Sequence, residues 1–284
     1  MKNILKFIAC SVFIASLSSS CIFKTADIRT TVAKNTQDET KARQLLQEMA
    51  IAHGLNAWND VETYEVSFED EFFGFIGKQG NPFKQDKTAM KIQYISNSYD
   101  GQLTILTGEE KDLTWGIQSW KTYTIAPEKE ADFQQNDEIY FWLPTYQYFI
   151  EFPFRIQRAD AVNYAGTSVI NNINCEGILA SWNTTAPQKE IDQYLIWINS
   201  ETKQIVKLEY TIREFYKFLT GAVYFQYLKN YDGILLPSVL PVESSLSKKN
   251  LHEMRIKDFK INPVTVEKLR PNKKLPLMGD AKEE

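Results

Sequence analysis

The spacing of apolar residues predicts one helix followed by a long series of strands. Between Lys41 and His53 apolar side chains recur every three or four residues, which is typical of a helix with one buried face. Asp38 is placed to cap its start and Gly54 to end it, and we expect His53 to face the helix dipole as a cation. Beyond residue 60, apolar and polar residues alternate as in half-buried strands. The alternating segments are 64–68, 90–94, 103–105, 115–125, 178–182, 194–198, 206–212, 223–227 and 252–261.

Tight turns join several of these strands. Asp100-Gly101 and Asp232-Gly233 are strong hairpin signals, because both residues tolerate the left-handed backbone that short hairpin turns require. No change of composition divides the chain, and about 230 residues can bury a sizeable core. We therefore predict a single α+β domain over residues 38–263, built on an antiparallel sheet.

Residues 139–154 interrupt the strand pattern. This segment, IYFWLPTYQYFIEFPF, is the most aromatic part of the chain and carries one charge. Trp142, Tyr146 and Phe149 recur at helical spacing, so we expect a helix buried on several sides. Pro144 predicts a break into two helices, and Pro153 predicts the end of the second. Either the protein's own sheet or an apolar ligand must cover so many aromatic side chains.

The N-terminus is typical of an exported protein. Residues 1–20 combine two lysines with an apolar run that is too short to span a bilayer, which is the pattern of a signal peptide. Small residues precede Cys21, as in bacterial lipoprotein signals, and Ser18 stands where an aliphatic residue is usual. We predict cleavage before Cys21 and acylation of its thiol; the alternative is an ordinary secretory signal with an incidental cysteine. Residues 21–37 then form a flexible tether, and residues 264–284 a loose tail.

The net charge and the cysteine content limit the kinds of partner that we expect for this protein. The net charge is -4 and becomes -6 without residues 1–20, which hold two lysines and no acid. No basic run is present, which argues against binding of nucleic acid. Membrane attachment is therefore expected through acyl chains on Cys21. Cys175 has no second cysteine to pair with in the processed chain, and we expect a monomer without disulfides.

The search for catalytic chemistry gives no candidate. The sequence holds two histidines and contains neither a Gly-x-Ser-x-Gly elbow nor a phosphate-binding glycine loop. Residues 69–71 are all acidic, but a solvated turn explains them better than a calcium loop. We take Arg155 and Arg158 as surface residues or as partners for acids on the sheet, with contact to a lipid phosphate as the alternative. We expect no catalytic residue, no metal site, no cofactor and no enzyme, although carboxylates paired on the sheet leave an unrecognised hydrolase open.

Several segments resemble a family of exported Bacteroidetes lipoproteins. They are FIEFPF at 149–154, YAG at 164–166, DQYLIWI at 192–198 and LEYT at 208–211. That family is distantly similar to the LolA/LolB-like outer-membrane lipoprotein-sorting proteins. The resemblance implies a strongly curved antiparallel sheet, an incomplete β-barrel, with helices covering its concave face. In the sorting proteins that concavity holds acyl chains.

Two functions follow from these patterns. The first is a lipoprotein that binds an acyl chain or lipid in the half-barrel. Its expected location is the cell envelope, on the periplasmic face of the outer membrane. The second is a structural or partner-binding envelope lipoprotein in which residues 139–154 are only core. For the first function the expected contacts are Phe141, Trp142, Tyr146, Phe149 and Phe152.

Overall fold

The computed structural model describes residues 24–35, 38–213, 217–244 and 249–279. The predicted signal peptide and Cys21 lie outside this range. The described strands form one antiparallel sheet in the order β6-β5-β4-β3-β2-β1-β14-β13-β11-β10-β9-β8-β7, with β12 paired to β13. Their bounds are β1 Thr63–Phe72, β2 Lys87–Ile95, β3 Gly101–Ile105, β4 Thr114–Gln118, β5 Lys121–Ile125, β6 Asp132–Phe133, β7 Ala161–Ile170, β8 Ile173–Ser181, β9 Gln193–Asn199, β10 Ile205–Thr211, β11 Thr220–Tyr224, β12 Gln226–Tyr231, β13 Ile234–Ser244 and β14 Asn250–Ile261.

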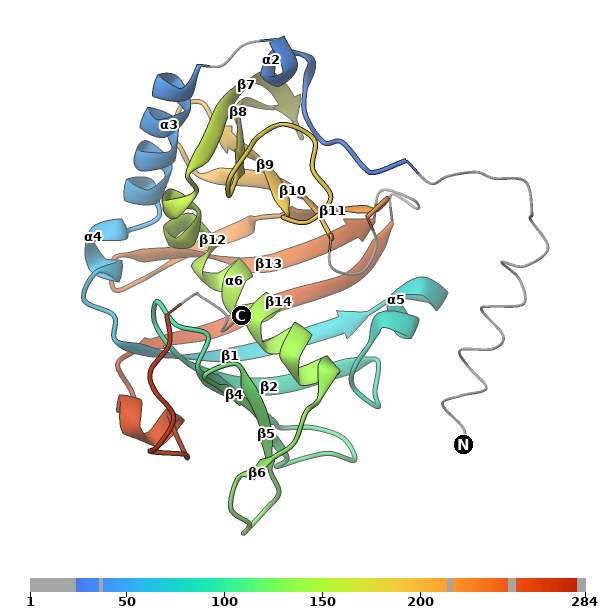
Figure 1. The fold of residues 1–284 in the computed structure, drawn as a ribbon, viewed down its shortest axis with the longest axis vertical. Helices are drawn as coiled ribbons and strands as arrows, with labels where there is room; N and C mark the ends of the chain where they lie inside the picture. The colour runs from blue at the N-terminus through green and yellow to red at the C-terminus, as the bar shows by residue number, and fades with distance from the viewer. Residues whose placement is uncertain (1–23, 36–37, 214–216, 245–248, 280–284) are drawn as a thin grey trace, which may run out of the picture.

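Helices lie around this sheet (Figure 1). The longest, α6, crosses one face of the sheet, while α3 runs beside β7 and β8 and α5 projects from the end of β1. The bounds are α2 Thr31–Asn35, α3 Glu39–Ala52, α4 Leu55–Trp58, α5 Gly74–Gly80 and α6 Asp137–Arg155, with short 3-10 turns η1 Ile156–Arg158 and η2 Val266–Leu269. Among these helices of the described residues, none combines the length and apolar character that a bilayer span requires.

Contacts of α6 show how strongly the sheet curves. The hydroxyl of Tyr94 on β2 donates to the carbonyl of Leu143, and Tyr194 on β9 packs against Phe152. β2 and β9 are six positions apart in the sheet order, which is about 29 Å in a flat sheet. Leu143 and Phe152 are nine residues apart, about 14 Å along the helix axis, so the sheet has to curve toward α6 for both strands to reach it. The sheet does not close, and the predicted incomplete barrel is confirmed.

The strand alternation correctly predicted which side chains face the core. Tyr64, Val66 and Phe68 of β1 are at most 2% exposed. The Asp38 cap is also confirmed, because its carboxylate accepts from the Lys41 amide at 3.0 Å. His53 differs from the prediction. It is buried between α3 and two strands, and burial lowers its pKa to about 4, so the ring is neutral instead of cationic.

The predicted tether packs on the sheet from Ala26 onward. The Ala26 amide donates to the Lys217 carbonyl at 2.9 Å beside β11, and the segment then reaches β7, where the Thr30 hydroxyl donates to the Ala165 carbonyl at 2.7 Å. Ala33 is buried against Trp197 and its neighbours on the side of the sheet away from α6. These small contacts leave no periodic pattern in the sequence. Residues 21–23 and 36–37 lie outside the described range.

The predicted loose tail also packs, from residue 264 to residue 279. Leu269 is fully buried, and the Arg270 guanidinium lies 3.2 Å from the buried Asp100 carboxylate. Asn272 and Gln118 exchange two hydrogen bonds. The tail therefore packs against the turns that join β2 to β3 and β4 to β5. The sequence did not predict this packing, because polar and charged side chains such as Arg270 and Asn272 make these contacts.

Candidate functional site

The candidate site is the concave groove of the sheet and the helix α6 that fills it. Asn136 starts the helix by accepting from the Ile139 amide at 3.0 Å, and two acidic residues follow in the first turn. The predicted break at Pro144 and stop at Pro153 are both wrong, since α6 is continuous to Arg155. Proline removes one backbone donor from such a helix. Here contacts with the sheet keep the residues before and after Pro144 in one continuous helix.

Two hydrogen bonds support the helix around Pro144. The Thr145 hydroxyl donates to the Phe141 carbonyl at 2.7 Å, one turn back. The Leu143 carbonyl accepts from Tyr94 at 2.7 Å, from the floor of the groove. The carbonyl of Tyr140, four residues before the proline, has lost its usual donor in the helix. Pro144 and Pro153 each remove one backbone donor from α6, and Pro144 is the one that lies between its half-exposed and its buried half.

The five predicted ligand contacts divide into two groups. Tyr146, Phe149 and Phe152 are buried, and their rings pack on aromatic rings of the sheet at centroid distances of 5.1 to 5.7 Å. Phe141 and Trp142 are half-buried, and Trp142 packs on Phe72 and His252 where β1 ends and β14 begins; we call this place the mouth of the groove. Trp142 meets Phe72 edge-on at 5.6 Å. Three of the five therefore belong to the core, while Phe141 and Trp142 remain partly exposed.

A polar group that the sequence did not reveal lies under Trp142. The Tyr146 hydroxyl donates to Asp70 at 2.8 Å, and Nδ1 of His252 lies 2.9 Å from the same carboxylate. Asp70 is fully buried, so the prediction of a solvated turn at residues 69–71 is wrong. The His252 ring stacks on Phe72 at 4.9 Å and meets Trp142 edge-on. Burial, with Asp70 adding to it, raises the pKa of Tyr146 well above its usual range.

A buried ion pair anchors the second half of α6. Arg155 was predicted to be a surface residue or a partner for an acid on the sheet; it is 2% exposed, and its Nε donates at 2.6 Å to Glu151 of the same helix. Glu151 also accepts from Tyr64 at 2.7 Å and from Gln147 at 2.8 Å. Burial raises the pKa of Glu151, while the charge of Arg155 opposes this rise. Arg158, in contrast, is exposed as predicted.

The two halves of α6 are therefore held differently. Before Pro144 the helix buries Ile139 and Leu143 and leaves its other side chains half or fully exposed. After Tyr146 nearly every side chain is buried, and the ion pair and Gln147 connect this half to β1 and the β2–β3 turn. A displacement that begins at the N-terminal half would disturb fewer contacts.

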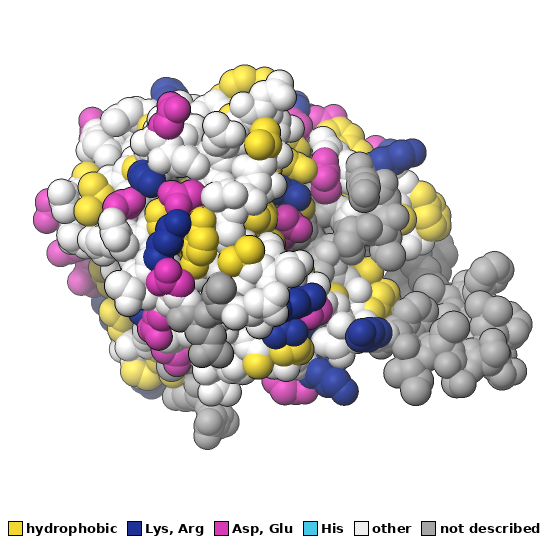
Figure 2. Space-filling model, turned by 90° about the horizontal axis from the view of Figure 1, so that it is seen from above, with side chains coloured by type: hydrophobic (Ala, Val, Ile, Leu, Met, Phe, Trp, Pro, Cys, Tyr) yellow, Lys and Arg dark blue, Asp and Glu magenta, His cyan; other side chains and the backbone are white. Residues whose placement is uncertain are grey.

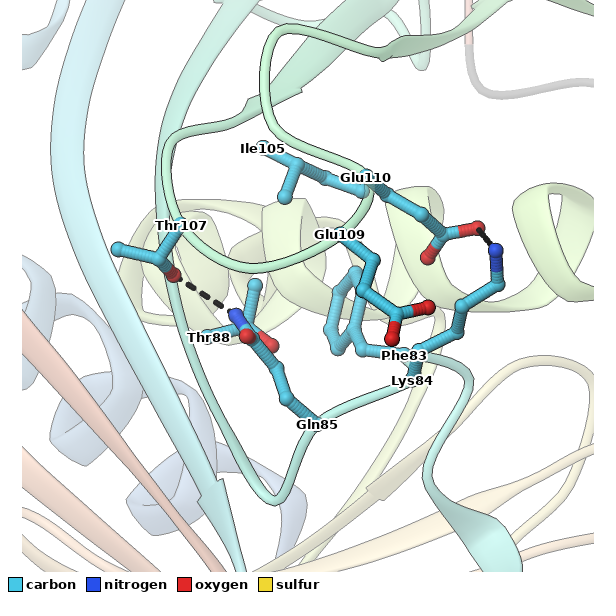
Figure 3. A pocket seen from close by; sticks show the side chains of 8 residues that line it. All are labelled: Phe83, Lys84, Gln85, Thr88, Ile105, Thr107, Glu109 and Glu110. Atoms are coloured by element: carbon cyan, nitrogen blue, oxygen red, sulfur yellow. Dashed lines mark hydrogen bonds and ion pairs between the residues drawn. The ribbon is translucent and has the colours of Figure 1, made fainter.

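Two surface pockets lie away from this groove. One, of about 10 Å³, is bordered by a hydrogen bond from Gln85 to Thr107 and an ion pair between Lys84 and Glu110 (Figure 3). It has room for about one water molecule. The other is an open depression of about 440 Å³ at the β7–β8 hairpin. No residue of α6 lines either one. Among the described residues, no three His, Cys, Asp or Glu side chains are placed to hold a metal ion.

Comparisons with known proteins identify the fold. No family model matches the chain, and no curated protein matches it. A domain described as that of an outer-membrane lipoprotein-sorting protein from Vibrio parahaemolyticus matches with a TM-score of 0.52 and 11% identity, over 83% of this chain and 97% of that one. A DUF1329-family protein from Desulfovibrio piger matches with a TM-score of 0.52 and 9% identity, over 84% and 99%. The chain thus shares the half-barrel of lipoprotein-sorting domains, as its sequence predicted.

Proposed function

We propose that the protein is a lipoprotein of the cell envelope that receives an acyl chain or lipid in the groove now filled by α6. Acylated Cys21 would hold it on the periplasmic face of the outer membrane. The observation that carries this proposal is the division of α6 at Pro144. One half is an anchored core helix, and the other is a half-exposed aromatic segment over an apolar groove.

The groove around Pro144 would suit an acyl chain. Its floor presents Phe72, which Trp142 covers from the N-terminal half of α6, and Phe68, which Tyr146 covers just after Pro144. Asp70 and His252 lie among these rings and would offer polar contacts to a headgroup or carboxyl end once Tyr146 or Trp142 moves. Binding sites for small apolar ligands commonly combine an apolar wall with a few polar groups of this kind.

The energies of displacement and binding are comparable. Burying about ten methylene groups contributes about 8 kcal/mol, at about 0.8 kcal/mol each. Exposing a large apolar side chain completely costs about 1.5–3 kcal/mol. Tyr140, Phe141 and Trp142 are already half-buried, so moving these three side chains outward while the buried Ile139 and Leu143 stay packed costs less than about 9 kcal/mol. An acyl chain can therefore offset the displacement of these three side chains, whereas removing the ion-paired half would cost more.

The second candidate is a structural or partner-binding lipoprotein in which α6 never leaves the groove. The full burial of Tyr146 and Phe152 favours it, because rings packed at this density need no ligand to cover them. Both candidates share the anchor and the fold. They differ in whether an apolar ligand displaces the N-terminal half of α6.

Binding of a fluorescent fatty-acid probe to the purified full-length protein tests the proposal. Trp142→Asp places a charge at the groove mouth and should weaken binding about tenfold or more, since burying an unpaired charge is costly. Trp182→Asp is the matched control, because Trp182 is also half-buried but packs on Tyr194 near the other half of α6. No saturable binding by the wild type, or equal losses in both variants, would refute the groove as the site. Ester and glycoside substrate screens test the expectation that there is no enzymatic activity.

A further inference from the structure

One end of the sheet carries exposed apolar side chains. There α5 follows β1 and bears Phe75, which is 77% exposed, and Ile76, which is 54% exposed. Phe218, in the connection between β10 and β11, is 37% exposed at the same end. Lys78 and Lys217 accompany them and pair with Asp86 and Glu190. Figure 2 shows Lys and Arg side chains together with Asp and Glu on its right side, the side to which α5 projects in Figure 1.

The outward direction of Phe75 and Ile76 is fixed by the way α5 packs. The Phe73 amide donates to the Leu251 carbonyl at 2.8 Å, just before the helix begins. Gly77 lies so close to β14 that a Cβ there would come within 2.1 Å of the same carbonyl. The inner face of α5 therefore admits no side chain. Phe75 and Ile76 remain on the outside although each would be more stable in an apolar environment.

The N-terminal segment reaches this same end of the sheet. The Ala26 amide donates to the Lys217 carbonyl at 2.9 Å, and Arg213 donates to the Ala26 carbonyl at 2.7 Å. Strand pairing then leads from β11 through β13 and β14 to β1, which ends in α5. Three strand spacings amount to about 15 Å. Cys21 precedes Ala26 by five residues, which span at most about 18 Å.

We propose that this end of the half-barrel lies on the surface of a lipid bilayer, with Phe75 and Ile76 inserted among the lipids. The proposal rests on the acylated Cys21 of the proposed function and adds an orientation to it. A long flexible tether would let the domain turn freely, but the hydrogen bonds at Ala26 place this contact only five residues from the anchor. The acyl chains would provide attachment, and α5 would select the face that meets the membrane.

This orientation would also place the groove mouth next to the lipid. Phe72 is the last residue of β1 and lies two residues before α5, and its ring meets Trp142 of α6. His252 pairs with Phe72 across the two strands. An acyl chain leaving the bilayer beside α5 would therefore meet the half-exposed segment of α6 first. Lipid would not have to cross an aqueous gap to reach the groove.

A fluorophore placed on α5 tests the docking. Lys78→Cys, labelled with a polarity-sensitive dye, keeps Phe75 and Ile76 intact; Cys175 is buried and acylated Cys21 has no free thiol. In vesicles of phosphatidylethanolamine and phosphatidylglycerol with brominated chains, we expect severalfold stronger quenching than for a label at Tyr227→Cys. Tyr227 is the matched control, because it is 76% exposed on β12, away from α5. Adding Phe75→Ser and Ile76→Ser should reduce quenching at position 78 to the control value.

The possible outcomes separate the two proposals. Equal quenching at positions 78 and 227, or no effect of the double serine change, would overturn the docking. If fatty-acid binding in solution stays intact, only the orientation falls. Strong quenching in a protein that binds no fatty acid would instead overturn the groove function alone. A protein that never associates with the vesicles would overturn the docking together with the anchor.

Discussion

Replacing Arg155 with methionine should strongly destabilise the protein. Arg155 and Glu151 are 2% and 0% exposed, and the Nε–carboxylate distance is 2.6 Å. Methionine fills much of the same space but carries no charge. It therefore removes the positive charge that lowers the pKa of Glu151 against the effect of burial. Breaking a buried ion pair on one side typically costs about 3–5 kcal/mol, because the partner remains charged and buried. The hydrogen bonds from Tyr64 and Gln147 should keep the loss near the lower value.

The pH dependence of this loss distinguishes a charge effect from a packing effect. The pKa of Glu151 is raised in the native protein, and loss of Arg155 raises it further. The native variant therefore binds a proton at pH values where the unfolded chain is ionised. Its stability must rise as pH falls through that window, since protonation relieves the buried charge. The difference between wild type and variant should be larger near pH 8 than near pH 5.

Urea unfolding followed by tryptophan fluorescence measures both quantities. Arg158→Met is the matched control, because Arg158 lies three residues away and is exposed. Surface changes of this kind usually alter the free energy of unfolding by less than about 0.5 kcal/mol. If Arg155→Met costs less than about 1 kcal/mol, or the same amount at both pH values, the assignment of Glu151 as a buried carboxylate is wrong.

Three further changes probe other parts of the account. Burial lowers the pKa of His53 to about 4, so the stability that its neutral form contributes is complete above pH 6.5 and falls by about 3 kcal/mol as the pH drops to 4. His53→Gln should abolish this pH dependence of the free energy of unfolding in urea titrations, and an unchanged dependence would contradict the assignment. Pro144→Ala restores a backbone donor to α6, so we expect a rise in thermal stability together with weaker fatty-acid binding; unchanged binding would show that the helix does not open there. Cys21→Ser should move the protein from the membrane fraction to the soluble fraction, and persistence in the membrane would refute the anchor.

The sequence predicted the sheet because burial of one face imposes a period of two. Tyr64, Val66 and Phe68 show this clearly, and their inward positions agree with it. The rule for proline failed at Pro144 because it considers the helix alone. Contacts such as the one from Tyr94 to Leu143 come from a strand about fifty residues away and stabilise a helix that local preference would break. The packed segments at both ends of the domain were missed for a similar reason, since few apolar residues hold them.

The polar groups of the groove were only partly accessible from the sequence. Asp70 follows Phe68 and precedes Phe72 at the same spacing, so its inward position was readable in the alternation. Its partner His252 is 182 residues away, and only the pairing of β1 with β14 brings the two together. Arg155 and Glu151 are four residues apart on one helix, and their burial depends on the sheet that wraps around it.

Native mass spectrometry of the protein, gently extracted from the envelope of its host, tests the central claim most directly. We predict a population that carries one additional acyl chain or lipid beyond the modification of Cys21. That population should disappear in Trp142→Asp and persist in Trp182→Asp. A single ligand-free mass for the wild type would contradict the claim and leave α6 as a permanent part of the core.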